Sequence, residues 1–229
     1  MTLNNQRTAL VVGASRGLGL GLAAELASRG WNVVGTVRDE AGAARLAAAG
    51  ARVGRVDIAD PASVAALARS LAGEIFDLVF INAGIKGPEH QDAAQASDDE
   101  IATLFLVNAV APVRIARAVL DRVRDGIGIV AFMSSDLGNI AGNSDGYIEL
   151  YRASKAALNS LVRSFTASIG GRRITVLAVH PGWVRTDMGG AEAPLSVEAS
   201  CRGIADVVER RAGSLRHGFV DYRGRDMAW

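Results

Sequence analysis

The residues best suited to chemistry in this chain are a tyrosine and a lysine that stand four positions apart, Tyr151 and Lys155. On a helix, residues i and i+4 share a face, with Cβ atoms about 5–6 Å apart. A fixed ammonium beside a phenol favours the phenolate, so we expect Lys155 to lower the pKa of Tyr151 from its usual value of about 10. The phenol then becomes a candidate general acid for a carbonyl oxygen.

A glycine-rich turn near the N-terminus supplies the second chemical signal. Gly13, Gly17 and Gly19 follow an apolar run that predicts a strand and open a stretch that predicts a helix. Glycines let the backbone approach a pyrophosphate, and the helix N-terminus offers free N–H groups and a positive dipole end. The turn therefore predicts a dinucleotide site, and with the Tyr–Lys pair it suggests hydride transfer. For the glycines alone, an ordinary strand–helix turn is the alternative.

The end of the second predicted strand bears on the choice between NADH and NADPH. An acidic residue there would bind the 2′-hydroxyl of NAD and repel a 2′-phosphate, but Val37 takes that place and Arg38 follows it. Arg38 and Arg16 could make bidentate contacts with one phosphate. We therefore predict NADP(H) as the preferred cofactor and NAD(H) as a possible one. Asp39 is the reservation, because a change of strand register would bring it to the ribose; solvated arginines are the alternative.

The composition predicts one domain that spans residues 1–229. Its 49% hydrophobic residues allow a large core. The 25 basic and 24 acidic residues give a formal net charge of +1, so no overall field favours nucleic acid or a membrane. A single cysteine, Cys201, excludes an internal disulfide and is expected to be a buried small hydrophobe.

Targeting and metal-binding signals are weak in the sequence. Residues 1–7 are polar and lack the apolar run of a signal peptide. Later apolar runs such as Ile127–Met133 fall short of the ~20 residues that cross a bilayer. His90, His180 and His217 show no metal-ligand spacing. We expect a cytoplasmic protein without a metal, acting on a small molecule.

Short β-rich runs alternate with alanine-rich helical runs, the pattern of a parallel sheet with helices on both faces. The strands are expected at Ala9–Val12, Asn32–Val37, Arg52–Val56, Leu78–Ile81, Ile127–Met133, Thr175–Val179 and Gly218–Asp221. The helices are expected at Gly17–Arg29, Glu40–Ala49, Pro61–Leu71, Asp98–Arg124, Glu149–Ile169 and Ser196–Arg211. Ligands bind outside the carboxyl ends of such strands, so the loops 85–96, 137–147 and 185–195 should line one crevice.

Polar residues follow several predicted strands. Asp57 could accept a hydrogen bond from an adenine amino group, and Asn82-Ala83-Gly84 ends the fourth strand. Such residues more often form turns or caps, so a structural role is the alternative for both. Ser134 and Ser135 end the fifth strand, where neighbours point to opposite faces. Only one can hydrogen-bond a substrate oxygen, and we choose Ser135.

Asn108 lies in an apolar helical stretch, where its amide must find partners or cost free energy. Pro112 removes the N–H that would bond to the Asn108 carbonyl. A kinked helix with a freed carbonyl could hold an ordered water that passes protons toward Lys155. A core asparagine satisfied by local backbone is the alternative.

These motifs occur in the order in which the short-chain dehydrogenase/reductase family carries them, and the chain resembles that family over essentially its whole length. The resemblance implies an α/β, Rossmann-type, doubly wound parallel sheet of seven strands in the order 3-2-1-4-5-6-7, within three α/β/α layers. It also implies a catalytic tetrad. Tyr151 would be the acid–base residue, and Lys155 would bind the nicotinamide ribose. Ser135 would polarise the carbonyl, and Asn108 would hold the relay water.

Within the family, the runs around Ser135, Tyr151 and His180–Gly190 are similar to those of C-factor and sniffer-type carbonyl reductases. The resemblance implies cofactor contacts from Gly13, Ser15, Arg16, Gly17, Leu18, Gly19, Arg38, Asp57, Ile58, Asn82, Ala83, Gly84, Tyr151, Lys155, Pro181, Gly182, Val184 and Thr186. An apolar substrate pocket is expected from Leu137, Tyr147, Trp183 and Met188, with a core role as the alternative. Two departures stand out: Val12 replaces the usual threonine, and the Ser135–Tyr151 interval is longer than usual.

The leading hypothesis is an NADPH-dependent reductase that converts a ketone, aldehyde or quinone-like carbonyl to the alcohol. One alternative is a dinucleotide-binding signalling protein of C-factor type. Another is a 3-oxoacyl thioester reductase, which calls for a basic docking patch that dispersed arginines do not provide. A homodimer or homotetramer is expected by analogy. We also expect Thr186–Leu195 to be a mobile lid, because Gly189-Gly190 loosen the backbone and little anchors the segment.

Overall fold

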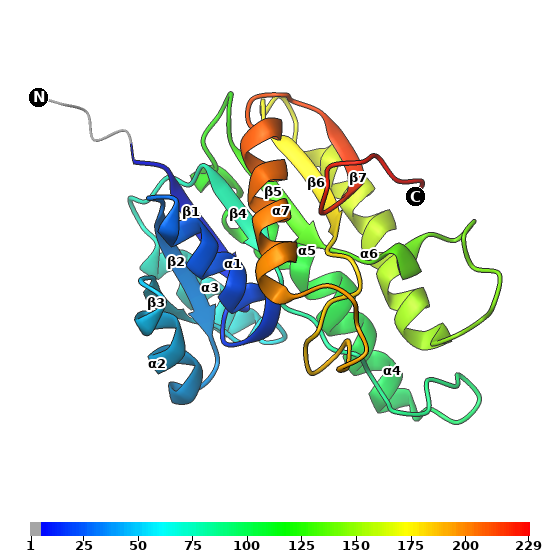
Figure 1. Cartoon of the computed structure of the whole chain (residues 1–229). Helices are drawn as coiled ribbons and strands as arrows, with labels where there is room; N and C mark the ends of the chain where they lie inside the picture. The colour runs from blue at the N-terminus through cyan, green and yellow to red at the C-terminus, as the bar shows by residue number, and fades with distance from the viewer. Residues whose placement is uncertain (1–5) are drawn as a thin grey trace, which may run out of the picture.

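The computed structural model describes residues 6–229, so most of the N-terminal stretch expected to lack a signal peptide lies outside the described residues. A seven-stranded sheet crosses the molecule in the order β3-β2-β1-β4-β5-β6-β7, with every neighbouring pair parallel (Figure 1). This confirms the predicted Rossmann-type order. The strands are β1 (Thr8–Val12), β2 (Asn32–Val37), β3 (Arg52–Arg55), β4 (Leu78–Ile81), β5 (Ile129–Met133), β6 (Thr175–His180) and β7 (His217–Asp221).

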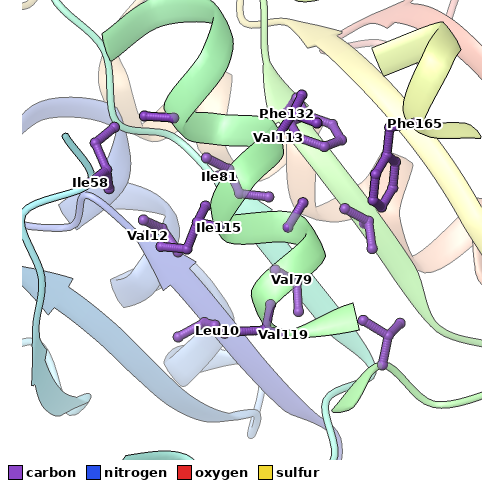
Figure 2. Close-up of a cluster of buried hydrophobic side chains, with 14 of the residues drawn as sticks. Leu10, Val12, Ile58, Val79, Ile81, Val113, Ile115, Val119, Phe132 and Phe165 are labelled. Carbon is purple, nitrogen blue, oxygen red and sulfur yellow. The ribbon is translucent and has the colours of Figure 1, made fainter. Parts of the chain in front are cut away.

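Helices cover both faces of the sheet, so the central strands are apolar on both sides, as parallel strands usually are. The α-helices are α1 (Gly17–Ser28), α2 (Glu40–Ala48), α3 (Pro61–Ser70), α4 (Asp98–Phe105), α5 (Ala111–Ala118), α6 (Glu149–Ser168) and α7 (Val197–Arg211). One core cluster joins the sheet to α1, α2 and α7 and includes the buried Cys201. The other joins it to α3, α5 and α6. Figure 2 shows the second cluster, in which Ile115 of α5 and Val119, directly after that helix, lie against strand residues such as Leu10 and Val79.

The expectation of one continuous helix over Asp98–Arg124 is wrong. The helix that begins there, α4, ends at Phe105, and three further helical segments follow it. A π-helix spans Leu106–Val110, α5 follows it, and a 3-10 turn closes the segment at Leu120–Arg122. Inside the π-helix the Ala111 N–H reaches back to the Leu106 carbonyl. Pro112 has no N–H to donate, which favours a change of helical register at this point.

One apolar segment is longer than expected, because it is long enough to cross a bilayer. Asp98–Ala118 has the length and composition of a membrane-crossing helix, contrary to the expectation that all apolar runs are too short. In this fold Leu104, Ala109 and Ile115 are almost completely buried. These three residues belong to the core, and 44% of the apolar stretch is buried inside the fold.

Candidate active site

The carboxyl ends of β1, β4, β5 and β6 carry the polar motifs. The chain order reverses between β1 and β4, which lie side by side in the sheet. Ligand crevices in open α/β sheets occur at this kind of reversal. The glycine turn follows β1, Asn82 follows β4, and Ser135 lies just beyond β5.

The glycine turn is packed so closely that two of its glycines, Gly13 and Gly19, have no room for a side chain. A Cβ on Gly13 would lie 2.8 Å from Ala83, and one on Gly19 would lie 2.0 Å from the Gly13 carbonyl oxygen. Asn82 Nδ2 donates to the Gly13 carbonyl at 2.7 Å. The Gly13 N–H in turn donates to Thr36 Oγ1 at 3.0 Å. Thr36 therefore supplies, from β2, a hydroxyl contact to the turn that Val12 cannot make, and its role was missed in the sequence.

The turn fits an anionic ligand. Gly17, the first residue of α1, has φ = +54°. The cap residue Arg16 offers no side-chain acceptor to α1, and no acidic residue occupies the first helical turn. The initial N–H groups of a helix need a partner, and a pyrophosphate is suited to that place. Thr186 approaches from the opposite side, with its Cγ2 3.7 Å from where a Cβ on Gly17 would be.

Asp39 and Arg38 differ sharply in their surroundings at the end of β2. Asp39 Oδ1 accepts a hydrogen bond from Gly42 N at 2.6 Å and caps α2. Arg38 is exposed. Arg45 of α2 lies at the glycine turn, with its Nε donating to the Ser15 carbonyl at 3.0 Å. Because Asp39 already serves the helix, its acidic role at the ribose is disfavoured. Arg45 is an additional basic group that the sequence pattern did not reveal.

Several residues expected to contact the cofactor have partners within the fold. Arg16 forms an exposed ion pair with Asp187, and its contact with a phosphate stays a prediction. Asp57 Oδ1 accepts from Ala59 N at 2.9 Å, the turn-forming role that was its alternative. The Ile58 side chain is 7% exposed and belongs to the hydrophobic core (Figure 2), while Leu18 packs at the edge of the other core cluster.

Tyr151 and Lys155 lie on α6, as predicted. Lys155 Nζ donates to the Met133 carbonyl at 3.0 Å and lies 5.6 Å from the centroid of the Tyr151 ring. Burial lowers the pKa of Lys155 to about 8. Burial also raises the pKa of Tyr151, and the charge of Asp136 raises it further. The expectation that the Tyr151 pKa lies below its usual value is therefore wrong for this structure, because burial disfavours the charged phenolate. The phenol keeps its proton at neutral pH.

Asn108 has all its side-chain partners within the fold. Its Nδ2 donates to the Ile85 carbonyl at 2.8 Å and to Ser154 Oγ at 3.0 Å, and its Oδ1 accepts from Ile85 N at 2.8 Å. Asn108 thus fixes the loop after β4. Its amide is satisfied in the core, as the alternative expected, but by the distant Ile85 and Ser154 and not by local backbone. A Cβ on Gly84 would lie 3.2 Å from Asn108 Oδ1 and 3.5 Å from Lys155 Nζ, so these three residues meet. The relay water remains a prediction.

The two serines after β5 have different partners. Ser134 Oγ donates to the buried Asn159 Oδ1 at 2.6 Å. Ser135 Oγ lies 3.1 Å from Asp136 Oδ1 and accepts from Leu137 N at 3.2 Å. Ser134 is thus committed to the core, which favours the choice of Ser135. A substrate oxygen would compete with Asp136 for the Ser135 proton.

Two cavities adjoin these residues. The larger, about 570 Å³, is lined by residues that include Arg16, Gly84, Pro88 and Met188. The smaller, about 360 Å³, lies at the ends of β5, β6 and β7 and is lined by charged groups that include Asp136 and His180. His180 Nδ1 accepts from Asp136 N at 3.1 Å, and burial lowers the pKa of His180. Within residues 6–229, no cluster of three His, Cys, Asp or Glu side chains could hold a metal ion.

The predicted apolar substrate pocket is not formed as expected. Met188 lines the larger cavity, and Leu137 is partly buried beside Ser135. Tyr147 is 69% exposed on the loop before α6, and Trp183 is 58% exposed. The long interval between Ser135 and Tyr151 forms a loop that extends away from the sheet before α6 (Figure 1), and Tyr147 belongs to this loop. These apolar residues do not form one wall.

The segment Thr186–Leu195 has more anchors than its composition suggested. Trp183 Nε1 donates to the Gly189 carbonyl at 2.8 Å, and Arg185 Nη1 donates to the Ala193 carbonyl at 2.9 Å. Ala193 is only 2% exposed. The expectation that little anchors this segment is therefore wrong.

The residues after β6 that are expected to contact the cofactor also hold this segment in place. Ser200 Oγ donates to the Pro181 carbonyl at 2.7 Å. A Cβ on Gly182, which has φ = +84°, would lie 2.9 Å from Leu195. Val184 is buried and forms a β-bridge with Leu195. The segment beyond β6 is therefore held at both of its ends.

The sheet order, the glycine turn and the Tyr–Lys pair define a dinucleotide-binding oxidoreductase. Residues 13–208 match a family model described as Enoyl-(Acyl carrier protein) reductase. The chain is 36% identical to C-signal of Myxococcus xanthus over 156 residues, which cover 67% of this chain and 92% of that protein. It belongs to the short-chain dehydrogenase/reductase family.

Solved structures of similar proteins cover the whole described fold. A short-chain dehydrogenase/reductase from Burkholderia multivorans with bound NADP is 40% identical, with a TM-score of 0.93 over 98% of this chain and 100% of that one. A carbonyl reductase from Pseudomonas aeruginosa PAO1 in complex with NADP is 42% identical, with a TM-score of 0.89 and the same coverage. These likenesses match the fold and the expected family.

Proposed function

We propose that this oxidoreductase uses NADPH to reduce a small-molecule ketone, aldehyde or quinone-like carbonyl to the alcohol. The observation that carries the proposal is the meeting of Gly84, Asn108 and Lys155 beside Tyr151, at the strand ends that also carry the glycine turn. When bound, the reduced nicotinamide supplies a hydride. The glycine turn would hold its pyrophosphate and Lys155 its ribose, while Arg38 would favour the 2′-phosphate.

The chain's own residues would manage the proton and the carbonyl. The Tyr151 phenol is protonated at neutral pH, since its ordinary pKa of about 10 is raised further by burial, and a proton donor must begin the reaction in that form. The Ser135 hydroxyl would turn from Asp136 to the substrate oxygen and hold it toward the phenol. The Lys155 ammonium, fixed by the Met133 carbonyl, would stabilise the phenolate that remains after proton transfer.

Oxidation of NADPH in the presence of a carbonyl panel tests the proposal. Tyr151→Phe should lower turnover by at least ~10²-fold, the low end for general acid catalysis, because the ring packing remains while the proton is lost. Tyr147→Phe is the matched control and should keep wild-type rates, since Tyr147 is exposed on the preceding loop. Unaltered turnover in Tyr151→Phe would eliminate the mechanism.

The likeness to C-signal supports a second candidate, a dinucleotide-binding signalling protein that acts through a partner. Tight NADPH binding without turnover of any carbonyl would favour it. The family description supports a third, a reductase of carrier-bound acyl thioesters, for which 3-oxoacyl thioesters belong in the panel. A homodimer or homotetramer is proposed by analogy with relatives, and light scattering can test it.

A further inference from the structure

Gln91 is a buried polar residue that the proposed chemistry does not use. It lies in the loop between β4 and α4, is 5% exposed and has a left-handed backbone with φ = +57°. Non-glycine residues in this conformation are uncommon and persist where the surrounding structure holds them, often next to functional groups. The side-chain contacts of Gln91 show what stabilises its left-handed backbone.

The Gln91 side-chain amide makes hydrogen bonds both to its own loop and to α6, the helix that carries Tyr151. Its Oε1 accepts from the backbone N–H of Tyr151 at 2.9 Å. Its Nε2 donates to the carbonyls of Lys86 at 2.9 Å and Pro88 at 2.6 Å. A Cβ on Gly87, which has φ = +89°, would lie 3.4 Å from Gln91 Nε2 and 3.0 Å from Leu104, so the glycine lets the loop close around the amide.

The contact between Gln91 and the Tyr151 N–H serves as the N-cap of α6, which has no side-chain cap of its own. The residue before the helix, Ile148, has φ = +51° and makes no side-chain cap hydrogen bond. The first N–H groups of a helix have no acceptor within it, and an oxygen from the capping side chain usually serves the third of them. Tyr151 occupies that third position, and Gln91 provides the oxygen from 60 residues earlier in the chain. Ala93 N adds a second link by donating to Glu149 Oε1 at 2.5 Å.

We propose that Gln91 is a positioning residue, which fixes the first turn of α6, and with it Tyr151, against the wall of the larger cavity. Lys86 and Pro88, which receive the amide, both line that cavity beside Gly84. A small displacement of a reacting group can cost large factors in rate, so a clamp on the Tyr151 backbone has catalytic value. The inference rests on the proposed carbonyl reduction for its effect on rate, but the clamp itself does not need a bound cofactor.

Two variants of Gln91 and one control test the clamp. Gln91→Met keeps the length of the side chain without its polar atoms, and Gln91→Gly also removes any backbone strain, because glycine adopts φ > 0 readily. Gln95→Met is the matched control: Gln95 is exposed on the same segment, and its amide contacts the Asp92 side chain. The measurements are exchange of the Tyr151 amide by NMR in the cofactor-free protein, the NADPH dissociation constant, and kcat.

Both Gln91 variants should exchange the Tyr151 amide at least ~10-fold faster, because a buried donor loses its acceptor. Their kcat should fall at least ~10-fold. The NADPH dissociation constant should stay within about twofold, the usual range for substitutions that touch no ligand. Gln95→Met should match wild type in all three measurements.

Two results would overturn the proposal. Unchanged Tyr151 exchange in both Gln91 variants would show that the clamp does not operate in solution. Faster exchange with unchanged kcat would reduce Gln91 to a structural cap. Failure of the proposed function has a different signature: the wild-type protein would turn over no carbonyl, while the exchange measurement would still decide whether the clamp exists.

Discussion

The two parts of the proposed site are built in different ways. The cofactor side is the glycine turn after β1, and the substrate side comprises the loop before α6 and the segment Thr186–Leu195. On the cofactor side, close contact with the backbone sets the geometry, since a side chain at Gly13 would collide with Ala83, beyond β4, and one at Gly19 with the turn itself. On the substrate side, side chains hold loops by their backbone carbonyls. Arg152 Nε, for example, donates to the Tyr147 carbonyl at 2.7 Å, while Tyr147 itself is exposed.

This difference explains why the sequence predicts the cofactor side more firmly than the substrate side. A turn without space for a Cβ accepts few residues, so its sequence is specific. A loop held by donors to backbone carbonyls tolerates many side chains, because every residue has a carbonyl to offer. Cofactor chemistry is therefore expected to be sensitive to single substitutions, and substrate selection to be more tolerant.

The largest effect is expected from Gly19→Ala on the cofactor side. Its Cβ would lie 2.0 Å from the Gly13 carbonyl oxygen, so the turn must move. We expect NADPH affinity to fall on the order of 100-fold, since displacements of about 1 Å have effects of that size. Gly171→Ala is the control, because no atom lies within 4 Å of a Cβ built there. Fluorescence titration gives both constants, and equal affinities would break the comparison.

A smaller effect is expected from Arg38→Leu. A charge-assisted contact with the 2′-phosphate contributes about 1.5–3 kcal/mol, so the KM for NADPH should rise at least ~10-fold while the KM for NADH changes little. Arg69→Leu, an exposed arginine on α3, is the control. If the wild-type enzyme uses both cofactors equally, the assignment fails. Asp39→Ala then becomes the test, although Asp39 caps α2 in this structure.

Asp136→Asn should change the ionisation of Tyr151 without removing it from its site. Burial and the Asp136 charge both raise the phenol's pKa, so loss of the charge should lower that pKa, leaving it raised by burial. In the cofactor-free protein, NMR of labelled tyrosine rings should show Tyr151 titrating at lower pH than in wild type. Asp98→Asn, an exposed residue at the start of α4, should leave the titration unchanged. An upward shift would contradict the stated cause.

The sheet could be predicted from the sequence because apolar runs and glycine spacing follow local rules. The bounds of β2 and β4, for example, agree with those expected. Pro112 indicated a kink in the helix beyond Phe105, but the sequence did not reveal a π-helix there or the contacts of Asn108 with the distant Ile85 backbone. Local periodicity carries no information about such a partner.

The sequence predicted where the Tyr–Lys pair lies, but it did not predict the pKa values. Because Lys155 follows Tyr151 by four residues, we expected both on one helix face, and α6 places them there. The sequence did not reveal how deeply the pair is buried, so the direction of the Tyr151 pKa shift was wrong. Gln91 was missed because a glutamine in a loop carries no pattern, and only the fold brings it to α6.

The smallest effect is expected on the substrate side, from Trp183→Phe. The variant keeps an aromatic ring but loses the donor to the Gly189 carbonyl, which it contacts at 2.8 Å. One such bond contributes about 1 kcal/mol, so local opening of Thr186–Leu195 should become about fivefold more frequent. Trp229→Phe is the control, since that ring packs on Phe219 at the C-terminus.

Hydrogen exchange can decide how that segment moves. The Arg185, Gly190 and Leu195 amides each donate to a backbone carbonyl, so they should be partly protected in the free protein and better protected with NADP and a carbonyl ligand. Trp183→Phe should raise free-state exchange of the Gly190 amide about fivefold and raise the substrate KM no more than that. High protection that is equal with and without ligands would mean a fixed wall. Substrate selection would then depend on the loop at Leu137–Tyr147, and the two sides would differ less than proposed.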